Sequence, residues 1–145
     1  MVKMFILCLI IINTSSAHAK NLGTETGLKI PRFVSLKSDN SNLRVGPDEN
    51  YPIKLRYIVA NTPVEIIDEY KDWRKINDYE GNKGWLHRSL IKGKRFAIVN
   101  TSYQEGLQVL NKPKGNNIGK IGKKNVLEVK ICLMNWFKIK YRENT

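Results

Sequence analysis

Few residues of this chain have the types and spacing that catalysis needs. Beyond residue 19 the sequence holds one histidine, His87, and one cysteine, Cys132, which are far apart. A nucleophile needs an adjacent base that a third group orients, and this spacing gives no sign of one. The acidic pairs at 68–69 and 78–80 stand beside polar turns, where solvated charge explains them. We therefore expect a protein that is not an enzyme.

Cofactor and metal sites also find no support in the sequence. No cluster of histidines and cysteines has the spacing of metal ligands. The segment 115–120, Gly-Asn-Asn-Ile-Gly-Lys, resembles a phosphate-binding loop, but no strand-loop-helix pattern surrounds it. We expect neither a cofactor nor a metal.

The aromatic residues are better candidates, because their spacing places several on one surface. Side chains alternate between the two faces of a β-strand. Trp73 and Ile76 are three positions apart, so they point to opposite faces. Leu86 stands between Trp85 and His87. If Ile76 and Leu86 enter a core, the two tryptophans and the histidine lie on the outer face.

Short apolar segments separated by turn formers must position these side chains. The pattern has no helical period, which predicts an all-β fold of tandem small antiparallel barrels. The expected strands of the first barrel are 43–45, 53–59, 64–70, 73–76 and 84–87, with turns at 46–50 and 78–84.

Two parts of the chain resemble each other at a period of about 64 residues. Leu43 matches Leu107, Trp73 matches Trp136, and "WRKI" matches "WFKI". The first copy continues to Gly84 and its closing strand, whereas the same spacing from Trp136 falls just past residue 145. We expect the second barrel to be C-terminally truncated, with an open strand edge through which a dimer could form.

The N-terminal residues have the pattern of an export signal. A lysine, the apolar run 4–12 and an Ala-His-Ala ending predict a signal peptide over 1–19. A membrane anchor is the alternative, but nine apolar residues fall short of the ~20 that span a bilayer. We expect a periplasmic or secreted protein without a transmembrane anchor after signal removal. Its parts are a flexible lead-in at 20–32, a first domain at 33–93 and a second at 94–145.

The segment "NLRVGPDENYP", followed by "DWRKI" and "GNKGWLHRSLI", resembles the bacterial SH3 (SH3b) domain family. The whole chain is similar to exported proteins of Gram-negative bacteria that carry two such modules. In those proteins the second module usually holds a Cys-…-Trp-Cys pair. Here Cys132 precedes Trp136, but Phe137 stands where the second cysteine would be, which leaves Cys132 without that disulfide partner.

The resemblance implies a ligand groove on the outer face of the first domain. Its expected residues are Arg44, Tyr51, Trp73, Trp85 and His87. Aromatic rings with one polar tip suit stacking on a sugar or an extended peptide. The alternatives are that Trp85 caps the barrel, that Trp73 covers apolar surface, and that Tyr51 packs on its own loop.

Positive charge is concentrated in the second half. Residues 92–145 hold twelve Lys/Arg against three Asp/Glu, while residues 33–91 hold nine of each. Such charge favours anionic partners, although a lysine-rich composition alone could produce it. We do not expect nucleic acid as a partner, because the lysine-rich segment 112–124 has no aromatic residue to stack a base and the signal peptide directs export.

These features predict a non-enzymatic envelope binding module that recognises peptidoglycan or a cell-wall peptide through the aromatic groove. One alternative is an accessory interaction protein that docks on an envelope enzyme. Another is a degraded gene product with a non-functional second module.

Overall fold

The structure, a computed structural model, describes residues 21–102, 105–133 and 136–140. The predicted signal peptide lies outside these residues. Nearly all regular structure is β-strand, which confirms the all-β prediction. Within the described ranges, no helix is long and apolar enough to cross a membrane. The elements are β1 (Arg32–Leu36), β2 (Ser41–Arg44), β3 (Ile53–Tyr57), β4 (Pro63–Tyr70), β5 (Trp73–Asp78), β6 (Lys83–His87), the 3-10 turn η1 (Arg88–Leu90), β7 (Ile91–Lys92), β8 (Phe96–Ile98), β9 (Leu107–Leu110), β10 (Asn117–Ile121), β11 (Val126–Leu133) and β12 (Trp136–Lys140).

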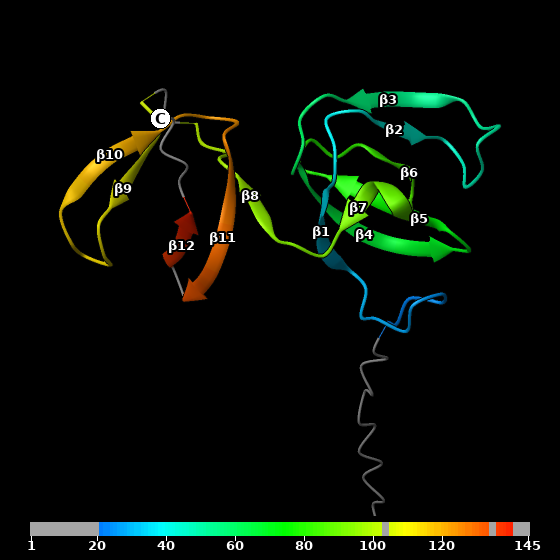
Figure 1. The fold of residues 1–145 in the computed structure, drawn as a ribbon, viewed down its shortest axis with the longest axis horizontal. Coiled ribbons are helices and arrows are strands. Elements are labelled where there is room, and N and C mark those ends of the chain that lie inside the picture. The colour runs from blue at the N-terminus through cyan, green and yellow to red at the C-terminus, as the bar shows by residue number, and fades with distance from the viewer. Residues whose placement is uncertain (1–20, 103–104, 134–135, 141–145) are drawn as a thin grey trace, which may run out of the picture.

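The first half is one antiparallel sheet of seven strands in the order β3-β2-β6-β5-β4-β1-β7. The sheet bends around its core, with β2 and β3 on one side and β4 and β5 on the other (Figure 1). Alternate residues of the strands point inward and bury a single apolar cluster. Its members are Val34, Leu36, Leu43, Tyr57, Val64, Ile66, Ile76 and Leu86.

A β-bulge in β4 decides which residues of its second half face outward. The pairing with β5 shifts between Ile66 and Asp68, so one residue of β4 has no partner. Before the bulge, Ile66 points into the core opposite Ile76. After it, Glu69 is buried and Tyr70 is exposed, next to its partner Trp73. The bulge therefore brings Tyr70 and Trp73 together on the outer face.

Residues 20–32 were expected to be a flexible lead-in, but the described residues 21–31 form a turn that covers one end of the sheet around Glu69. The carboxylate of Glu69 accepts hydrogen bonds from the backbone N–H groups of Glu25 (3.0 Å) and Thr26 (2.8 Å), and Thr26 Oγ1 donates to it at 2.8 Å. Arg32 Nη2 lies 2.6 Å from Glu69 Oε1, and Arg74 Nε lies 3.5 Å away. The composition of this segment gave no sign of these contacts.

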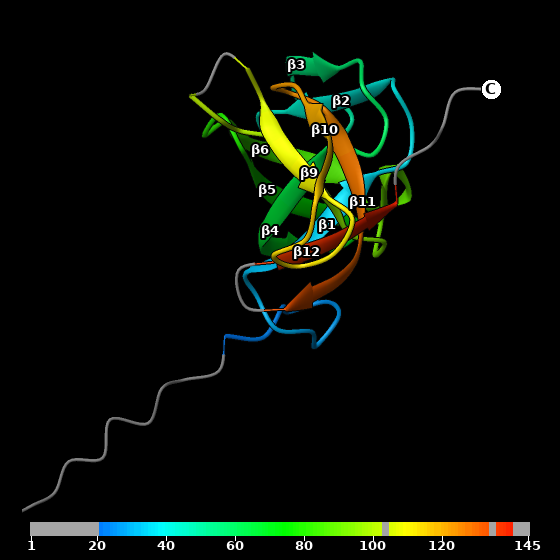
Figure 2. The same cartoon turned by 90° about the vertical axis from the view of Figure 1, so that its left-hand side faces the viewer.

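The second half contains two smaller sheets, β10-β9 and β12-β11-β8. They are drawn as separate sheets in Figure 1 and lie in front of the first half in Figure 2. The strand pairings of the second half repeat pairings of the first. β8 pairs with β11 as β1 does with β4, β11 pairs with β12 as β4 does with β5, and β9 pairs with β10 as β2 does with β3. β11 also carries a register shift, between Val129 and Ile131, 63 positions after the shift in β4.

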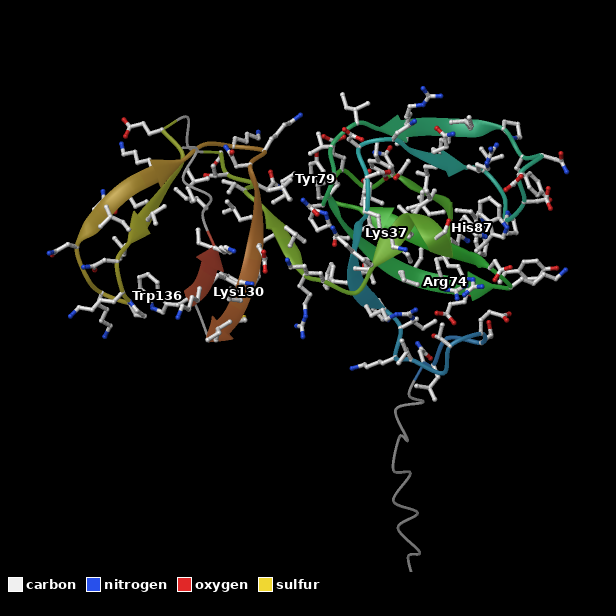
Figure 3. The ribbon with its side chains drawn as sticks, viewed as in Figure 1. Lys37, Arg74, Tyr79, His87, Lys130 and Trp136 are labelled. Carbon is white, nitrogen blue, oxygen red and sulfur yellow. The ribbon has the colours of Figure 1, made fainter. Side chains whose placement is uncertain are left out.

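The two halves meet along the loop after β5. Tyr79 lies on the side of the first half that faces the second (Figure 3) and lines a cleft of about 420 Å³ together with Ile98 and Val126. Glu80 and Lys124 form an ion pair across the same boundary, with Oε1 and Nζ 3.6 Å apart. Both partners are more than half exposed, so this pair contributes little to stability.

Candidate functional site

The first half carries a cleft of about 710 Å³ between the loop after β2 and the β4–β5 hairpin. Three aromatic rings and several polar groups line it. The lining residues are Pro47, Asp48, Asn50, Tyr51, Tyr70, Lys71, Asp72 and Trp73.

The loop after β2 is fixed by its own turn chemistry. Asp48 Oδ1 accepts hydrogen bonds from the backbone and side-chain nitrogens of Asn50, both at 2.9 Å, which forms an Asx-turn. The Tyr51 ring lies over Gly46, where an added Cβ would come within 2.5 Å of ring atoms. Arg44 Nη1 donates to the Tyr51 carbonyl at 2.7 Å. Tyr51 therefore has a defined position although its side chain is exposed.

The opposite wall is the two-residue hairpin between β4 and β5. Tyr70 pairs with Trp73, so Lys71 and Asp72 form the turn, and Lys71 has a positive φ of 48°. Asp72 is held from outside the hairpin, because Arg88 Nε lies 2.6 Å from its carboxylate and the Arg88 N–H donates to its carbonyl at 2.8 Å. The turn η1 thus supports this wall of the cleft.

Trp73 lies on the face opposite Ile76, as its spacing predicts, but it is only 9% exposed. His87 packs against it edge to face, with ring centroids 5.5 Å apart. His87 lies on the side of the first half remote from the second (Figure 3). Trp73 therefore forms a mostly covered wall of the cleft, on the outer face that its spacing predicts.

His87 has a structural task that the sequence did not reveal. Its Nδ1 accepts a hydrogen bond from the Ser89 backbone N–H at 3.3 Å and lies 2.7 Å from Ser89 Oγ. These contacts cap the N-terminus of η1. Because η1 also positions Arg88 beside Asp72, His87 supports the cleft from behind and does not line it.

Trp85 and Arg44 lie on the same outer face but outside the cleft lining. They are direct cross-strand partners on β6 and β2. Lys75 Nζ lies 5.8 Å from the centre of the Trp85 ring, which is within the range of a cation–π contact. Of the five predicted residues, the structure brings Tyr51 and Trp73 together in the cleft and places the other three around it.

Tyr70 is the aromatic residue of the cleft that sequence reasoning missed. Strict alternation from Ile66 would place Tyr70 on the core side, and only the bulge in β4 moves it outward. A bulge leaves no reliable mark in a single sequence. The hairpin residues Lys71 and Asp72 were missed for a related reason, since their place in the cleft depends on the fold bringing two loops together.

The arrangement is suited to binding. Aromatic faces supply apolar contact area, and Asp48, Asn50 and Lys71 add polar groups to the cleft lining. Among the residues that the structure describes, no group of histidine, cysteine and carboxylate side chains could hold a metal ion. The cleft lining includes neither His87 nor Cys132.

No curated protein matches the sequence of the chain. Residues 37–93, which contain every residue of the cleft lining, match the family model of the bacterial SH3 domain.

Proposed function

We propose that the chain is a non-enzymatic binding module of the cell envelope that binds peptidoglycan or a cell-wall peptide in the aromatic cleft. A bacterial SH3 domain itself suggests a binding module. The observation that carries the finer proposal is that Tyr51, Tyr70 and Trp73 line one open cleft within the matched segment. The predicted signal peptide, together with the family, supports an envelope location.

The chemistry of the cleft fits a chain-like ligand with apolar faces and polar edges. Sugar rings and extended peptides both present flat surfaces that stack on aromatic side chains. Asp48, Asn50 and Lys71 add polar groups to the cleft lining that can hydrogen-bond such a ligand. The cleft is open rather than enclosed, so a long polymer can lie across it with both ends outside.

Sedimentation of residues 20–145 with insoluble peptidoglycan, in low and in high salt, tests the proposal. Tyr51→Ala and Tyr70→Ala each remove the ring of a residue that is 46% exposed. Tyr79→Ala is the matched control, because Tyr79 is 38% exposed and lies outside this cleft. We expect each cleft variant to weaken binding about tenfold, as loss of an aromatic anchor does, and the control to bind like the parent.

Salt separates the cleft from the charge of the second half. Contacts with aromatic rings persist at high salt, whereas attraction through exposed lysines fades as the Debye length shrinks. Binding that disappears in high salt and ignores both cleft substitutions would overturn the proposal. Absence of binding in both conditions would favour an accessory protein that docks on an envelope enzyme, or a degraded gene product.

A further inference from the structure

The β9–β10 hairpin lies at the end of the second half that is remote from the first half (Figure 1). Its register pairs Ile121 with Leu107 and Gly119 with Val109. Paired residues share a face of the sheet, and Ile121 is buried, with 7% of its surface exposed. The face that carries Ile121 is therefore the inner face of the hairpin.

A β-bulge in β10 places an isoleucine on the opposite, outer face. The pairing shifts between Asn117 and Gly119, so Ile118 has no partner on β9. Ile118 and Lys120 each stand one position from Gly119, so alternation directs both to the outer face. Ile118 is 65% exposed, more than any other large apolar residue that the structure describes in the second half. An apolar side chain thus lies beside a lysine on the surface.

The loop at the end of the hairpin, residues 111–116, has a defined shape. The Asn111 N–H donates to the Asn116 carbonyl at 3.1 Å, and the Asn116 N–H donates to Asn111 Oδ1 at 3.0 Å. Lys112 and Lys114 stand on this loop with exposed side chains. The loop therefore holds two ammonium groups next to the strand that carries Ile118.

Positive charge on this hairpin is largely uncompensated. Residues 106–125 contain no acidic residue, and their lysines are Lys112, Lys114, Lys120, Lys123 and Lys124. Lys120 and Lys124 form ion pairs with exposed carboxylates. Among the residues that the structure describes, no carboxylate lies within ion-pair distance of the other three. Side chains that end in nitrogen surround the hairpin (Figure 3), which favours an anionic partner.

We propose that the outer hairpin face, made of the loop 111–116 with Ile118 and Lys120, docks on a lipid bilayer that contains anionic lipid. Lysines near such a bilayer are attracted to its negative surface. An apolar side chain among them enters the boundary between headgroups and acyl chains, and binding strengthens with the apolar area buried there. A soluble anionic polymer would use the lysines but would leave Ile118 exposed, so the combination favours a bilayer.

This docking goes beyond the binding of a ligand in the aromatic cleft and leaves that cleft accessible. The cleft lies between the loop after β2 and the β4–β5 hairpin, at the end of the first half that is remote from the β9–β10 hairpin (Figure 1). One half can therefore rest on a membrane while the other holds a cell-wall ligand.

Sedimentation of residues 20–145 with lipid vesicles tests the proposal without the apolar run at 4–12, which could itself enter a bilayer. One set of vesicles is pure phosphatidylcholine, and in the other set one third of the lipid is phosphatidylglycerol. We expect binding to the second set alone, with partial loss as salt rises and screens the lysines. Equal binding to both sets, or to neither, would overturn the proposal.

A pair of charge reversals locates the contact. Lys112→Glu with Lys114→Glu changes the loop, and Lys37→Glu with Lys83→Glu makes the same change at exposed positions of the first half. We expect the first pair to weaken vesicle binding about thirtyfold or more, and the second pair to have a much smaller effect. Equal effects of the two pairs would show that binding follows the net charge of the chain and would refute a specific docking face.

The isoleucine separates a bilayer from a soluble polyanion. Ile118→Ser should weaken binding to the anionic vesicles about tenfold, because it removes the inserted apolar group. Ile58→Ser is the matched control, since Ile58 is 76% exposed in the first half. Dependence on the lysines without dependence on Ile118 would indicate a site for a soluble polyanion and would overturn docking on a bilayer.

A gain of signal tests insertion without relying on weakened binding. Ile118→Trp should show a blue shift of its fluorescence on the anionic vesicles and quenching by lipids brominated on their acyl chains, whereas Ile58→Trp should show neither. An added tryptophan at 118 that brominated lipid does not quench would refute insertion. Tyr51→Ala and Tyr70→Ala, which change the aromatic cleft, should bind the vesicles like the parent, so the two proposals can fail separately.

Discussion

At the scale of single residues, Glu69 is the best example of a side chain whose role comes from its surroundings. Its side chain is fully buried, which raises the pKa of a carboxyl group. Hydrogen bonds from Arg32, Thr26 and the backbone of residues 25–26 outweigh that effect and lower the pKa of Glu69 from 4.5 to about 2. The sequence shows only an acidic pair beside a turn. In the fold, Glu69 becomes a buried, ionised carboxylate that holds its neighbours by hydrogen bonds and ion pairs.

Removing this charge should destabilise the first half. Glu69→Gln leaves Arg32 and Arg74 without their counter-charge in a mostly buried site. We expect the free energy of unfolding to fall by about 3 kcal/mol, as when one partner of a buried ion pair is removed. Chemical denaturation measures the change, with the exposed Glu49→Gln as control. A loss no larger than that of the control would show that the network adds nothing.

The same carboxylate predicts a pH dependence of stability. Because the folded-state pKa is lower than the unfolded one, ionised Glu69 stabilises the fold above pH 4.5, and this stabilisation is lost as the pH falls from 4.5 towards 2. Urea denaturation between pH 7 and pH 2 should show this loss in the parent. Glu69→Gln should show a shallower decline, and parallel curves would mean that other carboxylates account for acid unfolding.

At the scale of elements, β6 is the strand on which the organisation of the first half depends. It connects the two parts of the sheet, carries Trp85 and His87 on its outer face, and leads into η1, which supports the cleft. Its close approach to β2 requires Gly84, because backbone and side-chain atoms lie within 2.7 Å of where a Cβ would be. The hairpin β4–β5 and the loop after β2 can line one cleft only while β6 joins their strands.

Gly84→Ala should therefore disturb the sheet more than an alanine elsewhere. The nearest atom is a backbone carbonyl oxygen, which cannot move without shifting β2. We expect a loss of about 1–3 kcal/mol in unfolding free energy, the usual cost of overpacking. Gly93→Ala is the matched control, since nothing lies within 4 Å of its added Cβ. Equal stability of the two variants would show that β2 and β6 separate freely.

At the scale of the whole molecule, the two halves differ in how much apolar surface they bury. All eight members of the described core cluster belong to the first half. In the second half, Val99 and Ile121 are the buried apolar side chains among the described residues. Regions with few buried contacts open at lower free energy than the global unfolding. The chain should consequently not unfold in a single two-state transition.

Amide hydrogen exchange of the unbound chain measures this difference directly. We expect the amides of β4, β5 and β6 to exchange much more slowly than those of β9, β10 and β12, because their strands enclose the apolar cluster. Thermal unfolding followed by tryptophan fluorescence and by circular dichroism should give different midpoints. Coincident midpoints with uniform protection would show that the two halves unfold together.

Several features could be predicted from the sequence because they depend on neighbours along the chain. Alternating apolar residues and turn formers are sufficient for the all-β fold, since each strand needs one apolar face and each reversal needs residues that tolerate it. The glycine, proline and tryptophan spacing identified the SH3 resemblance that the family comparison supports over residues 37–93. The faces of Trp73 and Ile76 also followed from strand periodicity.

Other features arise only when distant segments meet. Tyr70 lines the cleft because a bulge shifts the register of β4. His87 does not line it, because its ring caps η1. The turn at residues 25–26 is held against the sheet because Glu69, more than 40 positions away in sequence, accepts its backbone hydrogen bonds. Local sequence determined the strands and their faces, since periodicity acts over a few residues. Tertiary structure decided exposure, register and the cleft itself, since these depend on what each strand packs against.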